Sequence, residues 1–403
     1  MTSIGATHRA GTQPRARIDC LDALRGLCAL SVALFHFNTT GTLTNLPFVR
    51  HAWMLVDFFF VLSGFVITAA YADALGRGMS LRRFLLLRLA RIWPLHVVML
   101  LCFVALELSK LVVATPFVSP LFSEPRGLAS LLMNVLLLQV FGLYDYVTWN
   151  APSWSIAAEF WVYLLAALCF RFWRGNRPIV AAAIAGTCAL VMLASGSPYL
   201  NLTYNGAVVR CLYGFSLGAL TWSIFTQDAQ GRAIVAERAQ TAAVATILEI
   251  LGVTALVAAV WLLDDGPFTI ALPWLFAACV LILARQGGAL SGLLSHRLPV
   301  WLGTISYSIY MTHLFIEGRI LDILTIAGQL LDRTFVERIV EDGIARRVVV
   351  GSEAFINLTV LALVMLILAV SYGSYRLVEQ PCNRWARNRL AKLPAPVPLR
   401  AAS

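Results

Sequence analysis

The chain has 403 residues, of which 59% are hydrophobic and only 13% carry a formal charge. A soluble globular domain has roughly 25% charged residues, so these proportions exclude an ordinary cytosolic enzyme as well as a disordered chain. The net charge of +10 does not indicate nucleic-acid binding, because the basic residues stand in short clusters between apolar runs. Runs of about 20 apolar residues can cross the hydrocarbon core as helices. The composition predicts an all-α, polytopic membrane protein.

The apolar runs predict ten membrane-spanning helices, which the arginine clusters orient. The expected spans are 20–38, 54–72, 92–114, 153–170, 178–195, 207–225, 243–263, 269–284, 300–316 and 354–376. Five Arg residues lie from Arg77 to Arg91, which places this segment in the cytoplasm after two crossings. With ten spans both termini are cytoplasmic, so we expect one transmembrane domain over 19–385 between cytoplasmic tails at 1–18 and 386–403.

Two further segments are predicted not to cross the membrane. The run 128–141 is short, and a crossing there would move Arg171, Arg174 and Arg177 to the outer face. We therefore expect it to be interfacial or re-entrant. The segment 317–353 carries charges of both signs and is predicted to form one amphipathic helix on the outer side.

Cysteine chemistry and leader peptides contribute little to the prediction. The eight Cys residues contain no CxxC pair and lie mostly in apolar runs, so we expect packing residues and neither disulfides nor a metal site. The first apolar run contains Asp22 and Arg25 and lacks an Ala-x-Ala exit, so no cleavable signal peptide is expected.

The first expected span carries three ionisable residues, Asp22, Arg25 and His36. Inserting each such group costs roughly 2.5–3.5 kcal/mol of free energy at the centre of a bilayer, so its presence there indicates a structural or functional role. At 100° per residue, Arg25 and His36 fall within about 20° of one helix face, and Asp22 within about 40° of it. Neutral histidine is a natural general base near pH 7. The alternatives are an ion pair between Asp22 and Arg25 and a structural, interfacial imidazole at His36.

Asp57 opens the second expected span on the side where His36 ends the first. It is placed to orient that imidazole, although aspartate is also a common helix N-cap. Arg88 and Arg91 are spaced i,i+3 and project from one helix face at the cytoplasmic surface. Paired guanidinium groups suit a phosphorylated ligand, whereas anchoring of the topology explains an arginine cluster equally well.

Polar stripes occur on two other expected spans. Ser155, Glu159 and Tyr163 are spaced i, i+4, i+8, and Glu159 needs a partner in an apolar span, such as an Arg or the His36 region. Tyr310 and His313 stand at helical spacing in a second stripe. A structural ion pair and an interfacial aromatic belt are the alternatives.

Together these residues resemble the acyltransferase-3 family of integral-membrane acyltransferases, over about 18–385. The motifs, in order, are LDALRG followed by His36, DFFFVLSGF, Arg88-x-x-Arg91, PSWSIAAEFWVY, LGTISYSIYMTH and Glu379 in RLVEQP. Each motif is weak alone, but six in order are specific. Some relatives carry a fused esterase-like domain, which we do not expect in this chain.

The resemblance implies an enzyme of the bacterial cytoplasmic (inner) membrane that moves an acyl group, usually acetyl, from cytoplasmic acyl-CoA to a hydroxyl of a polysaccharide, lipopolysaccharide or related glycan. It implies that His36 is catalytic, that Arg25 supports it, and that Arg88 and Arg91 hold the donor. No permanently bound cofactor and no nucleic acid is expected. The remaining candidates are catalytic Asp57 and Glu159, and, for substrate contact or support, Asp22, Ser155, Tyr163, Tyr310, His313 and Glu379.

A transporter or flippase is the main alternative, because intramembrane Arg, Glu and His also build substrate and proton paths. Against it, the sequence has no paired repeat and no matched broken helices. A requirement for a thioester donor would distinguish the two classes.

Overall fold

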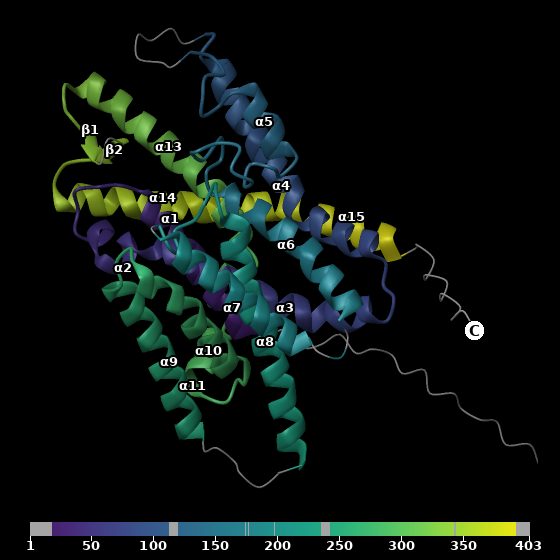
Figure 1. Cartoon of the computed structure of the whole chain (residues 1–403). Helices are drawn as coiled ribbons and strands as arrows, with labels where there is room; N and C mark the ends of the chain where they lie inside the picture. The colour runs from purple at the N-terminus through teal and green to yellow at the C-terminus, as the bar shows by residue number, and fades with distance from the viewer. Residues whose placement is uncertain are drawn as a thin grey trace, which may run out of the picture.

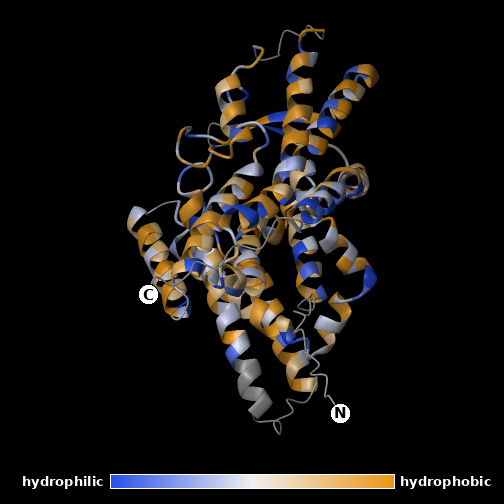
Figure 2. Ribbon diagram, turned by 90° about the vertical axis from the view of Figure 1, so that its right-hand side faces the viewer, coloured by the Kyte–Doolittle hydropathy of each residue, from blue (hydrophilic) through white to orange (hydrophobic). Residues whose placement is uncertain are grey.

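The computed structural model describes residues 18–112, 120–173, 175, 177–196, 198–234, 242–341 and 344–391 (Figure 1). The first predicted tail, except for its last residue, and Arg174 lie outside the described residues. The helices are α1 (Asp19–His36), α2 (Pro47–Arg50), α3 (Val56–Gly76), α4 (Leu81–Ser109), α5 (Leu128–Val135), α6 (Ser153–Phe172), α7 (Arg177–Ser195), α8 (Ala207–Ile234), α9 (Ala242–Leu262), α10 (Leu272–Ala284), α11 (Ala289–Leu294), α12 (Arg297–Thr304), α13 (Ser306–Leu331), α14 (Glu353–Ser374) and α15 (Gln380–Ala391). Hydrophobic residues predominate along the helices of the bundle (Figure 2).

Within the described ranges, eight helices are long and apolar enough to cross a membrane. The protein is therefore a mostly helical, polytopic membrane protein, as predicted, although the count of ten is not confirmed. The two expected spans that miss this criterion are those of α1 and α13. Both carry several ionisable residues, among them His36 and His313, so the helices least suited to lipid by composition hold the candidate catalytic groups.

Close backbone contacts bring α1 against the start of α13. A Cβ atom on Gly303, in α12, would meet the carbonyl oxygen of Asp22 at 2.0 Å, and one on Gly26 would meet the backbone nitrogen of Gly303 at 2.5 Å. Only glycine permits such an approach, which is the usual role of small residues between membrane helices. The contact places Arg25 beside the first turn of α13.

The segment after α13 corrects the prediction of one amphipathic helix over 317–353. Helix α13 ends at Leu331, and an antiparallel hairpin of β1 (Val336–Glu341) and β2 (Ile344–Val349) follows. Mixed charges do not distinguish helix from strand, whereas the β-branched Val and Ile residues of this segment favour strands. The hairpin is anchored beside the candidate base, because the amide of Val349 donates to Asn38 at 3.0 Å and that of Thr40 donates to Val349 at 3.0 Å.

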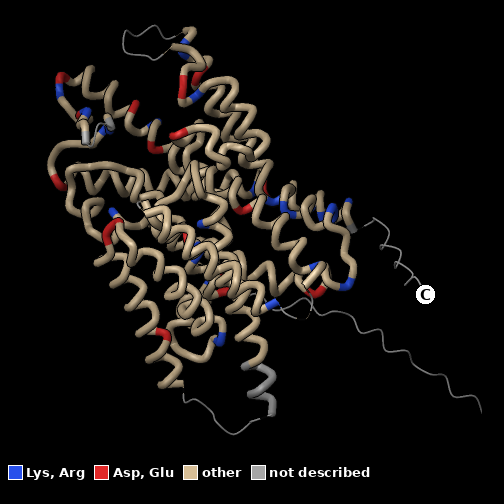
Figure 3. Tube along the Cα trace, in the orientation of Figure 1, with Lys and Arg blue, Asp and Glu red and all other residues tan. Residues whose placement is uncertain are grey.

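Basic residues mark the two ends of the bundle (Figure 3). One group follows α15 and the loop between α3 and α4, which is the predicted cytoplasmic end. A second, smaller group lies at the far ends of α4 and α13 and on the hairpin. The run 128–141 contains only α5, with eight residues, which is far short of the roughly 20 that a crossing requires.

Candidate active site

Two adjoining cavities lead into the bundle. The wider one, about 860 Å³, is lined at its basic rim by Arg384 and Arg387 of α15, together with Asp22 and Glu379. The narrower one, about 130 Å³, is formed by α1, α3, α4, α6 and α13. Both cavities share Arg25, Arg91, Leu62 and Val66 as lining residues. They therefore form a path that narrows from the end of the bundle that carries α15 toward the centre of the protein.

Arg25 lines both cavities and connects α1 to the start of α13 by hydrogen bonds. Its Nε donates to the Ser306 hydroxyl at 2.8 Å, and its Nη2 donates to the Gly303 carbonyl at 2.9 Å. Its guanidinium also lies 3.2 Å from the carboxylate of Asp22. The ion pair that the sequence offered as an alternative is thus present, and the same arginine faces both cavities.

Glu159 lies in the wall of the narrow cavity within a network of hydroxyl groups. It accepts hydrogen bonds from Ser63 and, at 2.6 Å, from Tyr163. Among the described residues its hydrogen-bond partners are these two hydroxyls, and neither an arginine nor His36 is one of them. Arg88, in the same wall, donates to the Tyr71 hydroxyl at 2.8 Å, while its buried Nε has no hydrogen-bond partner in the described part of the chain.

The two candidate histidines form a pair that does not line the narrow cavity. The Nδ1 atom of His36 lies 2.9 Å from the Val32 carbonyl oxygen and 3.3 Å from Nε2 of His313. His313 is fully buried, and its Nδ1 lies 3.1 Å from the Ile309 carbonyl oxygen. A neutral His36 that donates its Nδ1–H to Val32 keeps a lone pair on Nε2, which a general base requires.

Tyr310 separates this pair from the cavity. Its hydroxyl accepts a hydrogen bond from Ser155 at 2.9 Å, and its ring lies 5.9 Å from those of Phe59 and His313. Tyr310, Ser155 and Phe59 line the narrow cavity, whereas His36 and His313 do not. A molecule in the narrow cavity therefore meets Tyr310 before it meets the histidines.

Asp57 does not orient His36, which corrects the role predicted for it. Its carboxylate is fully buried and pairs with Arg210 of α8 at 2.7 Å. The guanidinium of Arg210 is also held between the rings of Trp53 and Trp154, at 5.3 and 5.1 Å. The available signal was Arg210 itself, because an arginine in an apolar span requires a buried acid as its partner.

Three further residues were missed by sequence reasoning. Arg384 and Arg387, in the wider cavity, are spaced i,i+3 shortly after Glu379, which itself accepts a hydrogen bond from Ser308 at 3.2 Å.

Glu317 stands one helical turn beyond His313 and is only 2% exposed. Its Oε1 has no hydrogen-bond partner among the residues described. The same ranges contain no cluster of three His, Cys, Asp or Glu side chains that would hold a metal ion.

Comparison with known proteins matches the model of the family described as "Acyltransferase domain" to residues 18–376. The chain belongs to the acyltransferase-3 family. A curated relative, named "Putative peptidoglycan O-acetyltransferase YrhL" of Bacillus subtilis (strain 168), is 28% identical over 333 residues, which are 75% of this chain and 49% of the relative. The chain thus spans about half the length of that relative. No solved structure matches.

Proposed function

We propose that this acyltransferase-3 chain is a membrane O-acyltransferase that transfers an acyl group, expected to be acetyl, from cytoplasmic acyl-CoA to a hydroxyl of a cell-surface glycan. The observation that carries the proposal is the arginine-lined pair of cavities that leads to Tyr310, whose ring lies beside the His36–His313 pair. The name of the Bacillus subtilis relative makes peptidoglycan the first acceptor to test. The proposed location is the bacterial cytoplasmic membrane.

The path suits the two parts of a CoA thioester. The nucleotide is polyanionic, and Arg384 and Arg387 supply guanidinium groups at the rim of the wider cavity. The pantetheine arm is long, thin and mildly polar, which suits the narrow cavity. Arg91 lines both cavities and Arg88 lines the narrow one. The pair is thus proposed to bind the pyrophosphate of the donor, at the point where the nucleotide meets the pantetheine arm and the path narrows.

The proposed chemistry uses His36 as the base. Nε2 of His36 takes the proton of the acceptor hydroxyl, and the oxygen attacks the thioester carbonyl carbon. The carbon–sulfur bond then breaks, and the leaving thiolate takes the proton from the imidazolium, which yields the ester and free CoA. The Val32 carbonyl stabilises the imidazolium by accepting its Nδ1–H at 2.9 Å, and the nearby Nε2 of His313, 3.3 Å from the same nitrogen, shares that proton. Attack by His36 itself, with a transient acyl-imidazole, would use the same nitrogen.

The test supplies isotope-labelled acetyl-CoA to membranes that contain the protein, followed by fractionation of glycans and small molecules. We expect label in an alkali-labile ester on a glycan, and none with His36→Ala at equal protein abundance. Near-normal labelling by the His36→Ala variant would show that His36 is not the base. Movement of an unmodified substrate without a thioester donor would instead indicate a transporter.

A further inference from the structure

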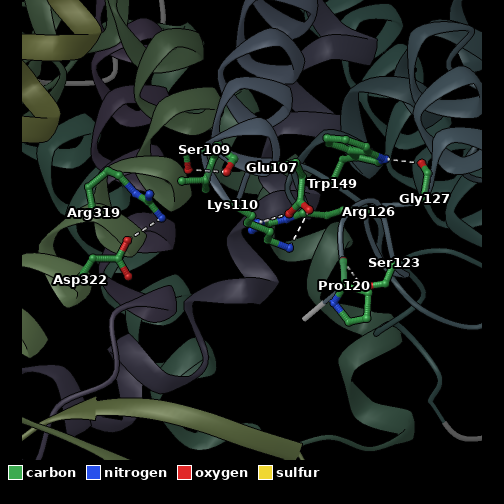
Figure 4. A network of polar contacts seen from close by, with 11 residues as sticks. Glu107, Ser109, Lys110, Pro120, Ser123, Arg126, Gly127, Trp149, Arg319 and Asp322 are labelled. Atoms are coloured by element: carbon green, nitrogen blue, oxygen red, sulfur yellow. Dashed lines mark hydrogen bonds and ion pairs between the residues drawn. The ribbon is translucent and has the colours of Figure 1, made fainter. Parts of the chain in front are cut away.

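A cluster of charged side chains lies at the end of α4 farthest from its cytoplasmic arginines (Figure 4). The carboxylate of Glu107 contacts Lys110 at 2.6 Å and Arg126 at 3.0 Å. Nearby, the carboxylate of Asp322 contacts Arg319 at 2.7 Å and Arg347 of β2 at 2.6 Å. We name Lys110, Arg126, Arg319 and Arg347 the outer cation cluster. Its four cations exceed the two carboxylates by two positive charges.

Aromatic rings hold two of these guanidinium groups in place. Arg126 lies 5.2 Å from the ring centroid of Phe103, and Arg319 lies 5.4 Å from that of Phe315. The two rings pack edge to face at 5.3 Å. Arg126 and Arg347 also lie close enough to Arg319 to interact with it electrostatically. The like charges are thus fixed near one another, and an anion placed among them would relieve their repulsion.

The cluster is unexpected for topology, and one of its guanidinium groups, that of Arg319, is incompletely hydrogen-bonded within the described residues. Positive residues next to membrane spans favour the cytoplasm, so arginines on the outer side oppose the rule that orients the chain. The Nε atom of Arg319 is buried and has no hydrogen-bond partner in the described ranges. A role in binding accounts for both features.

The outer cation cluster lies on the same helix as His313, which contacts the candidate base. Arg319 follows His313 by six residues, which is about 9 Å along the helix axis and about 120° around it. A hydroxyl at His36 and an anionic group at Arg319 would then belong to the same or neighbouring sugar units. The buried carboxyl of Glu317 lies between the two positions along the helix.

We propose that the outer cation cluster binds a carboxylate or phosphate group of the acceptor glycan, so that the enzyme selects anionic over neutral acceptors. The proposal rests on the proposed acyl transfer. It goes further by assigning the acceptor's charge class and the residues that recognise it.

The test uses the purified protein in nanodiscs of zwitterionic lipid, with two matched acceptors. One is the disaccharide of N-acetylglucosamine and N-acetylmuramic acid with its free carboxylate, and the other is the carboxamide of the same disaccharide. We expect a lower KM for the carboxylate form and a preference that falls with salt. Arg319→Gln or Arg126→Gln should raise that KM roughly 10- to 100-fold, because a charge-assisted hydrogen bond is lost, and should affect the carboxamide much less.

Three variants serve as controls for folding and charge. Arg319→Lys keeps the positive charge and should retain most of the preference. Asp322→Asn removes the acid that Arg319 and Arg347 share and should lower the KM for the carboxylate acceptor. Arg333→Gln removes an exposed charge from the loop after α13 and should leave both acceptors unchanged.

Several outcomes would overturn the proposal. One is equal KM values for the two acceptors in the wild type, and another is an equal loss for both acceptors in the Gln variants. An effect of Arg319→Gln that appears only when anionic lipid is added would assign the cluster to lipid headgroups. Direct binding of the fluorescently labelled disaccharides separates this proposal from the acyl transfer. If no CoA is released, tighter binding of the carboxylate form that depends on Arg319 still supports the cluster, and equal binding refutes it.

Discussion

At the residue scale, the histidine pair divides the work of the candidate site. His36 is half-buried and His313 is fully buried, so we propose that His36 is the one that an acceptor hydroxyl reaches. His313 acts on substrate only through its contact with Nδ1 of His36. Its proposed part is to fix the ring orientation and tautomer of His36, which makes it a positioning residue.

His313→Gln tests that division. We expect kcat to fall about 10- to 1,000-fold, because general-base catalysis typically contributes 10²–10⁴-fold and the base remains present but poorly held. The donor KM should change little, and the pH profile of kcat should shift. Thr325→Ala, at an exposed position on the same helix, is the matched control. An unchanged kcat and pH profile would reduce His313 to a packing residue.

Arg88 and Arg91 are tested as a pair. Changing both to Gln should raise the apparent KM for acetyl-CoA tens- to hundred-fold, because charged hydrogen bonds are worth roughly 1.5–3 kcal/mol each. The loss should be smaller for acetyl-pantetheine, which lacks the nucleotide phosphates. Donor affinity should fall with salt in the wild type and less steeply in the variant.

The control for this pair is Arg82→Gln, which removes an exposed arginine from the first turn of the same helix. It should insert normally and keep the wild-type donor KM. If the double variant behaves like Arg82→Gln, the pair serves only to anchor topology, as positive-inside residues do.

At the element scale, α3 and α8 are joined by close packing and by one buried ion pair. A Cβ atom on Gly64 would meet the Phe215 carbonyl oxygen at 1.9 Å, and one on Gly218 would meet that of Val61 at 1.9 Å. Beside these contacts, Asp57 of α3 and Arg210 of α8 are 0% and 1% exposed. The pair therefore belongs to the joint between two helices and not to the chemistry at His36.

Asp57→Asn should destabilise the protein without changing its chemistry. Removing one partner leaves the Arg210 charge buried and uncompensated, which typically costs about 3–5 kcal/mol. We expect a lower melting temperature in detergent, while the protein that remains folded keeps the wild-type pH profile of kcat. Asp57→Asn combined with Arg210→Met should recover part of the loss, because the unpaired charge is gone. A shifted pH profile with unchanged stability would restore the orienting role.

At the scale of the whole molecule, the cavities that begin at Arg384 and end at Tyr310, the histidine pair and the outer cation cluster follow one another through the bundle. This order requires that α4 crosses the membrane and that 128–141 does not. With that arrangement the cytoplasmic donor and the outer acceptor reach His36 from opposite sides.

Cysteine labelling tests the arrangement. In a background without the eight native Cys residues, Asp145→Cys should react with an impermeant reagent added outside, because the loop after α5 is predicted to lie on the outer side. Arg82→Cys should react only after the membrane is opened. Labelling of residue 145 from the cytoplasm would show that 128–141 crosses the membrane. It would also reverse the assigned orientation of every later span.

Membrane elements were more predictable than the contacts between them. The bilayer requires long apolar runs, and eight of the expected spans appear as helices that are long and apolar enough to cross. The hairpin at 336–349 was missed because its segment lies beyond α13, where apolar periodicity no longer constrains the backbone. The role of Asp57 was wrong because its partner, Arg210, stands 153 residues away.

The sequence by itself determined the class of protein, the approximate spans and the list of polar residues that an apolar helix cannot carry without a reason. It did so because the cost of polar groups in lipid acts on each span separately. Only the tertiary structure decided which of these residues meet. His36 and His313 are 277 residues apart and are in contact. Asp57 and Glu159 instead pair with residues other than His36. Such pairings follow from how helices pack, and no spacing within a single helix encodes them.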